Sequence, residues 1–273
     1  MDDSATRTNY VELLKRYKKL RNQLISIIEE RESLIKHKFY NLKTDYIKKI
    51  GCLEFELYEL DVKMGQAKRR IELVDLALEA DITVNLSNIE TEIMREFEDF
   101  EEILKLKDKE IQIAEYFSST DKISDKEILE LKKYYKKTAR LIHPDIHSNL
   151  SEIQKSLWNK ANTAYENGGL IYLKIIYKLA YDESVNMPKL EDYSVDEINS
   201  KIHYFEDKIK SNLEDIKELR ENFPFNKEEL LNDEIKVKEV QRELRQTIRE
   251  AKDILEIMEG HFLLILDERQ YIN

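Results

Sequence analysis

The sequence has few of the residues that interrupt helices. Its 273 residues include only five glycines and three prolines, and segments with the pattern of a strand are nearly absent. Charged residues make up 37% of the chain, and Glu, Lys, Leu and Ile are abundant. This composition is typical of long amphipathic helices rather than of a compact sheet protein. The sequence therefore predicts an all-α fold.

Cysteine and long apolar runs are also scarce. The single cysteine, Cys52, excludes an internal disulfide and any zinc module built from paired Cys-x-x-Cys motifs. It lies beside Leu53 in a helical stretch, where we expect a buried thiol. No run of about eighteen apolar residues exists, and the first ten residues lack a basic-then-apolar signal. We therefore expect a soluble, cytoplasmic protein with no membrane partner.

Sequence motifs of catalytic, phosphate-binding or metal-binding sites are equally rare. We find no Ser-His-Asp spacing, no Gly-rich phosphate loop and no cluster of metal ligands, so we expect no enzyme and no cofactor. His143 and His147 could share a metal on a helix, but Pro144 lies between them and disfavours helical geometry. The net charge of −11 argues against a nucleic-acid partner. The basic run at residues 68–70 is interpreted as a solvated helical face.

The most informative stretch, residues 132–165, predicts two helices joined by a short loop. The apolar side of the first helix consists of Leu131, Tyr135, Ala139 and Ile142. Its other face is basic and carries Lys132, Lys133, Lys136, Lys137 and Arg140. Pro144 ends this helix at His143. We expect His143 and Asp145 to project from the loop.

The second helix of this stretch is predicted to begin at Ser151. Ser151 and Gln154 have the spacing of a capping box. Its apolar positions are Ile153, Leu157, Trp158, Ala161, Ala164 and Tyr165. Two helices joined by a short loop pack antiparallel when their apolar faces meet. The loop would then form the tip of a helical hairpin whose first arm is basic.

Residues 135–145 (YKKTARLIHPD), followed by residues 162–165 (NTAY), resemble the J domain of DnaJ-type co-chaperones. The resemblance covers roughly residues 110–182 and implies docking on a DnaK-type chaperone ATPase. The implied docking residues are Lys132, Tyr135, Lys136, Lys137 and Arg140. The implied trigger for ATP hydrolysis is His143, Pro144 and Asp145, named here the HPD turn.

The chain departs from the J-domain pattern at two places. Residues 110–117 occupy the place of the first J helix but match it only loosely, so that helix is either the end of a longer helix or degenerate. After Tyr165 no flexible glycine-phenylalanine region follows. Instead, Gly168 and Gly169 form a turn, and residues 170–181 predict another apolar helix.

Heptad-like seams surround this region. Residues 4–38 and 46–78 keep apolar residues at alternating steps of three and four, and we expect the two helices to fold back antiparallel. The phase is lost near residues 37–43. We divide the chain into a coiled-coil region (1–109), a J-like domain (110–182), a linker (183–193) and a C-terminal helical hairpin (194–273). Capping boxes are predicted at Ser87/Glu90, Ser124/Glu127, Ser194/Glu197 and Asn226/Glu229.

Two functions fit this pattern. The first is a co-chaperone that stimulates a DnaK-type ATPase, with coiled-coil arms for client binding, targeting or oligomerisation. The second is a structural or scaffold protein with a non-stimulating J-like domain. The seams pair within one chain or between two copies in a homodimer, and both arrangements stay open. The co-chaperone interpretation requires that Asp145 and the basic helix are not covered by the protein's own helices.

Overall fold

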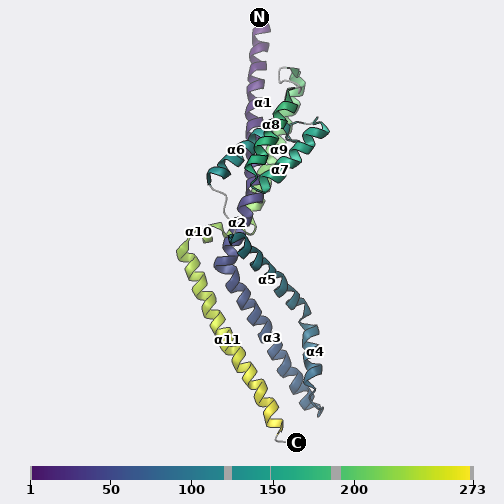
Figure 1. Ribbon diagram of the computed structural model, residues 1–273, viewed down its shortest axis with the longest axis vertical. Helices are drawn as coiled ribbons and strands as arrows, with labels where there is room; N and C mark the ends of the chain where they lie inside the picture. The colour runs from purple at the N-terminus through teal and green to yellow at the C-terminus, as the bar shows by residue number, and fades with distance from the viewer. Residues whose placement is uncertain (1, 120–124, 148, 186–191, 271–273) are drawn as a thin grey trace. The chain divides into compact units, whose positions relative to one another are not determined.

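The computed structural model describes residues 2–119, 125–147, 149–185 and 192–270, which are almost entirely helical (Figure 1). No strand occurs in these ranges, which confirms the all-α prediction. No helix in them is long and apolar enough to cross a bilayer. The chain forms two compact units: unit 1 contains residues 1–41 and 121–226, and unit 2 contains residues 42–120 and 227–273. This division differs from the consecutive regions that we predicted.

The N-terminal helical stretch runs from Asp2 to Glu79 and contains two π-helical turns. Its elements are α1 (Asp2–Ser33), η1 (Leu34–Lys38), α2 (Phe39–Tyr46), η2 (Ile47–Gly51) and α3 (Cys52–Glu79). The predicted loss of phase near residues 37–43 begins within η1, because a π-turn inserts an extra residue without ending the helix. Within the two units α1 packs on α9 and α6 and α3 packs on α11, so the antiparallel pairing expected for α1 and α3 is not found there.

In unit 1, α1 pairs with α9 (Val195–Glu221). The rings of Tyr17 and Phe205 lie 5.2 Å apart. The ion pairs Arg16–Glu206 and Arg220–Glu30 each join residues 190 positions apart. A constant offset means that the two helices run parallel. The apolar seam of α9 is buried at Ile198, Ile202, Phe205, Ile209 and Ile216, whereas Leu213 is exposed.

The remaining helices of unit 1 are α6 (Asp125–Ile142), α7 (Glu152–Glu166) and α8 (Leu170–Ser184). Here α6 packs against α7, α8 and α1. Every predicted core residue of α6 and α7 is buried except Ile153, and the Ser151–Gln154 capping box is present. Since α1 packs on both α9 and α6, Ile25 and Ile28 are also buried.

In unit 2, α3 runs parallel to α11 (Glu234–Gln270). Gln241 Nε2 donates to the carbonyl oxygen of Lys49, and Lys252 Nζ lies 2.7 Å from Glu56 Oε1. Buried residues of this interface are Leu60, Ile248 and Ala251. Cys52, at the start of α3, is only half-buried, and burial raises the pKa of its thiol.

Two further helices of unit 2, α4 (Leu86–Glu96) and α5 (Glu98–Ser119), run back along α3. Arg70 pairs with Glu90 and Arg69 with Glu96, which fixes this antiparallel arrangement. The basic run of residues 68–70 therefore lies on a helical face and is engaged with carboxylates, since Lys68 also lies 3.9 Å from Glu72.

The predicted caps have mixed outcomes. The Ser194–Glu197 capping box is present. The cap of α4 is Asn85 rather than Ser87, because the Asn85 side chain accepts from the Asn88 amide. Ser124 lies outside the described residues.

The last helix begins later than predicted and pairs with a different helix. A short 3₁₀ turn, η4 (Phe225–Lys227), and α10 (Glu228–Asn232) precede it. The carboxylate of Asp233 then accepts from the first amides of α11. The predicted hairpin of α9 with α11 is wrong, because α9 packs on α1 and α11 packs on α3.

Candidate functional site

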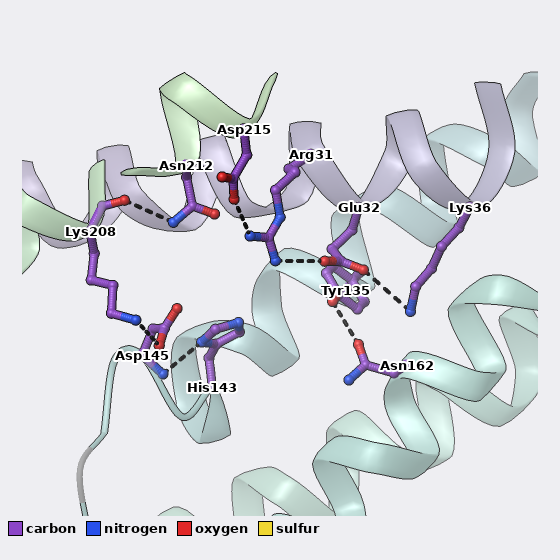
Figure 2. Close-up of polar contacts among 10 residues, drawn as sticks. All are labelled: Arg31, Glu32, Lys36, Tyr135, His143, Asp145, Asn162, Lys208, Asn212 and Asp215. Atoms are coloured by element: carbon purple, nitrogen blue, oxygen red, sulfur yellow. Dashed lines mark hydrogen bonds and ion pairs between the residues drawn. The ribbon is translucent and has the colours of Figure 1, made fainter. Parts of the chain in front are cut away.

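The HPD turn ends α6 in a conformation that its own hydrogen bonds fix. The His143 amide still donates to Ala139 O at 3.0 Å, and the His143 carbonyl accepts from the amides of Ile146 and His147, both at 2.9 Å. The Asp145 amide donates to His143 Nδ1 at 2.9 Å (Figure 2). Pro144 has no amide to donate. The imidazole is therefore part of the turn.

His143 does not project from the turn as the sequence predicted. Its ring lies 4.4 Å from that of Trp158 in an edge-on contact, and the residue is only 8% exposed. Burial lowers the pKa of His143 to about 4, although Asp145 and Glu32 act in the opposite direction. At neutral pH the ring is uncharged. Because Nδ1 accepts a hydrogen bond, its proton is on Nε2.

Asp145 faces α9 from within the same unit. Its Oδ1 lies 3.1 Å from Lys208 Nζ and accepts from the hydroxyl of Tyr204 at 3.4 Å. The hydrogen bond to Asp145 is the main cause that raises the pKa of Lys208. The Asp145 side chain is 28% exposed, and Pro144 beside it is exposed. The turn thus presents Pro144 to solvent and Asp145 mainly to α9.

Tyr135, which the resemblance placed among the docking residues, is fully buried. Its ring stacks on Tyr165 at 4.2 Å, and its hydroxyl donates to Asn162 Oδ1 at 2.7 Å. Burial raises its pKa far above the ordinary value. In this structure Tyr135 joins α6 to α7, and its buried side chain is not accessible to a partner protein.

Lys136 is engaged within unit 1, although its side chain is 37% exposed. Its Nζ lies 3.2 Å from Glu29 Oε2 on α1, and the buried Glu29 carboxylate also accepts from the hydroxyl of Tyr165 at 3.2 Å. Glu29 therefore connects α1 to both arms of the hairpin. The basic helix is partly laid against the protein's own acidic side chains.

The other basic residues of α6 are more available. Arg140 and Lys133 are exposed, while Lys132 and Lys137 are half-buried. Lys137 Nζ lies over the rings of Tyr134 and Tyr177, at 5.0 and 5.3 Å. None of these four forms an ion pair with another residue in the described ranges. They form a basic surface beside the HPD turn.

A polar network on α1 and α9 borders the turn (Figure 2). The Arg31 guanidinium contacts Asp215 at 2.9 Å and Glu32 at 3.1 Å. The Asn212 amide donates to the carbonyl of Lys208 at 2.8 Å. No sequence pattern indicates the roles of Glu29, Tyr204 or Lys208, because charged and tyrosine residues on amphipathic helices are ordinarily solvated.

The arrangement is suited to recognition. Among the described residues, no three His, Cys, Asp or Glu side chains are placed to hold a metal ion. His147 Nε2 is engaged with the Arg140 carbonyl at 2.9 Å. What the site offers is a rigid turn with one carboxylate and an adjacent set of cations.

No model of a known protein family, no curated protein and no solved structure matches this chain. The resemblance to J domains therefore depends on the motif and its spacing. Residues 110–117, at the place of the first J helix, are the end of the longer helix α5 and belong to unit 2. In unit 1, α6 packs on α1 in addition to α7 and α8.

Proposed function

We propose that this chain is a J-domain-type co-chaperone that binds a DnaK-type ATPase and stimulates its ATP hydrolysis. The observation that carries the proposal is the HPD turn itself. Its imidazole is hydrogen-bonded inside the turn, and the turn directly follows a helix with four basic side chains that form no ion pair with another described residue. The helical arms of the two units would serve client binding, targeting or oligomerisation.

The residues divide into two groups under this proposal. Lys132, Lys137 and Arg140 would contact the partner, with Pro144 and Asp145 of the turn. Exposed ion pairs contribute about 0.2–1 kcal/mol each, so the basic surface orients the encounter more than it holds it. Tyr135, Lys136 and His143 would act from inside, because they keep the hairpin and the turn in shape.

The test is ATP turnover by the host's DnaK-type chaperone at low salt. We expect the wild-type chain to raise turnover and Asp145→Asn to abolish the increase while circular dichroism stays unchanged. Asp207→Asn removes an exposed carboxylate of α9 and serves as the matched control. If the wild-type chain leaves turnover by every cognate chaperone unchanged, the co-chaperone proposal fails.

A scaffold function is the second candidate, and one observation favours it. Asp145 and Lys136 are both engaged inside unit 1, as in a hairpin that serves only as a packing element. A scaffold predicts that neither the wild-type chain nor Asp145→Asn changes ATP turnover. Light scattering would then test whether the chain forms a homodimer. The apolar seams of α1 and α3 already pack on helices of the same chain, so these seams are not free to pair with a second copy.

A further inference from the structure

We infer that α9 controls the HPD turn, because Lys208 and Tyr204 occupy the Asp145 carboxylate that a partner chaperone would need. The inference rests on the proposed function, in which Asp145 is a contact group. Both α9 side chains reach the same oxygen, Oδ1, at 3.1 and 3.4 Å. The chain thus carries an internal competitor for its own site.

The helix that carries the competitor is firmly placed. The buried side chains of Ile202, Phe205 and Ile209 anchor α9 on α1. The ion pairs Arg16–Glu206 and Arg31–Asp215 hold it on both sides of Lys208. The packed helix fixes the backbone of Lys208 next to the turn, so only the lysine side chain has to be ordered for the contact.

The hairpin that carries Asp145 is tied to the same helix. Glu29 of α1 binds Lys136 of α6 and Tyr165 of α7. Asp145 and Lys208 are therefore both positioned through α1, within one compact unit. Their contact is a built feature of unit 1 and does not depend on how the two units are placed.

The chemistry of the competitor indicates what must replace it. Lys208 supplies a cation and Tyr204 a hydroxyl donor, so a partner must present a cation with a hydrogen-bond donor to the turn. Lys208 can leave by rotation of its side chain, because that side chain is 38% exposed. The α9 seam need not open.

The expected effect is modest. A partly exposed pair of this kind contributes roughly 0.4–1 kcal/mol, which corresponds to a two- to five-fold change in affinity for the partner. The competitor therefore tunes the encounter and does not forbid it.

The first experiment measures the contact without any partner. Reductive methylation followed by mass spectrometry gives the rate of modification of each lysine in the full chain. We expect Lys208 to react several-fold more slowly than Lys210, which is exposed on the same helix. Asp145→Asn should raise the rate at Lys208 and leave Lys210 unchanged. Equal rates at the two lysines, or no response to Asp145→Asn, would overturn the inference.

The second experiment tests whether the contact between Lys208 and Asp145 limits stimulation of the chaperone. Lys208→Met keeps the aliphatic stem and removes the charge, and Lys210→Met is the matched control. We expect Lys208→Met to lower the concentration for half-maximal stimulation of the chaperone two- to five-fold, and Lys210→Met to leave it unchanged. Equal stimulation by wild type and Lys208→Met would show that the contact has no regulatory effect.

The two experiments separate this inference from the proposed function. If methylation shows the contact but neither wild type nor Lys208→Met stimulates any chaperone, the co-chaperone proposal fails and with it the regulatory role. If wild type stimulates but Lys208 reacts like Lys210, the co-chaperone proposal stands and α9 is not a competitor.

Discussion

His143 illustrates how a single side chain shapes the site from within. Its Nδ1 accepts from the Asp145 amide and its ring packs on Trp158, so the imidazole supports the backbone that displays Pro144 and Asp145. A residue with an acceptor nitrogen at this position and a flat apolar face is needed. A charged imidazole has no acceptor nitrogen, and burial disfavours its charge.

Protonation of His143 should therefore destabilise the fold. Its pKa is about 4 in the folded chain, against about 6.5 for an ordinary histidine. Between these values the unfolded chain binds more protons, so stability is complete above pH 6.5 and falls as the pH falls toward 4. Burial lowers the pKa of His147 in the same direction.

Urea unfolding at pH 6.5 and at pH 5 measures this effect. For His143 the loss in the free energy of unfolding approaches about 1.4 kcal/mol per pH unit. His203→Gln changes a histidine whose side chain is 77% exposed and serves as the control variant. A constant free energy of unfolding across this range would contradict the prediction.

Tyr135 offers a second prediction at a single residue. Tyr135→Phe removes the hydroxyl that donates to Asn162 Oδ1 and keeps the ring stacked on Tyr165. We expect a loss of about 1 kcal/mol in the free energy of unfolding, measured by urea denaturation, because Asn162 loses a partly buried partner. An unchanged midpoint would mean that water replaces the hydroxyl. If a partner contacted Tyr135 directly, Tyr135→Phe would lower the stimulation of ATP turnover by more than the loss in folding stability explains.

At the scale of elements, the sequence predicted which face of a helix is buried better than it predicted which helix packs against that face. The apolar positions of α6, such as Leu131 and Ala139, are buried as expected, since a 3.6-residue period marks one face. The same period shows that α1 needs a partner but does not say which helix supplies it. Glu29 and Lys208 have no periodic signal, so the contacts that close the site could be found only from the packing.

Glycine in α11 gives a prediction for that helix. Gly260 has open space around its Cβ direction, whereas a Cβ on Gly65 of α3 would lie 2.9 Å from the ring of Phe97. Gly260→Ala should raise the free energy of unfolding by about 0.5–1 kcal/mol, because glycine is costly within a helix. Gly65→Ala should gain less, since the ring must move. Thermal unfolding of both variants tests this, and an equal gain would contradict it.

At the scale of the whole molecule, each unit takes its helices from both halves of the chain. The linker predicted at residues 183–193 suggested that residues 194–273 form a separate piece. Residues 186–191 of that linker lie outside the described ranges. Sequence reasoning placed the boundary by composition, but long-range pairing of α9 with α1 assigns α9 to the J-like hairpin.

Truncation distinguishes these divisions. A chain that ends at Asn226 keeps every helix of unit 1, so Trp158 should stay shielded from acrylamide as in wild type. A chain that ends at Tyr193 lacks α9 and exposes the seam of α1, and its Trp158 should become more accessible. Equal quenching in the two truncated chains would contradict the assignment of α9 to unit 1.

The parallel pairings also have a consequence for synthesis on the ribosome. The contacts Arg16–Glu206 and Lys49–Gln241 join residues 190 and 192 positions apart. At roughly 5–20 residues per second, the apolar stripes of α1 and α3 would wait about 10–40 s before their partners emerge. For that interval the nascent chain is itself an aggregation-prone substrate for the cell's folding machinery.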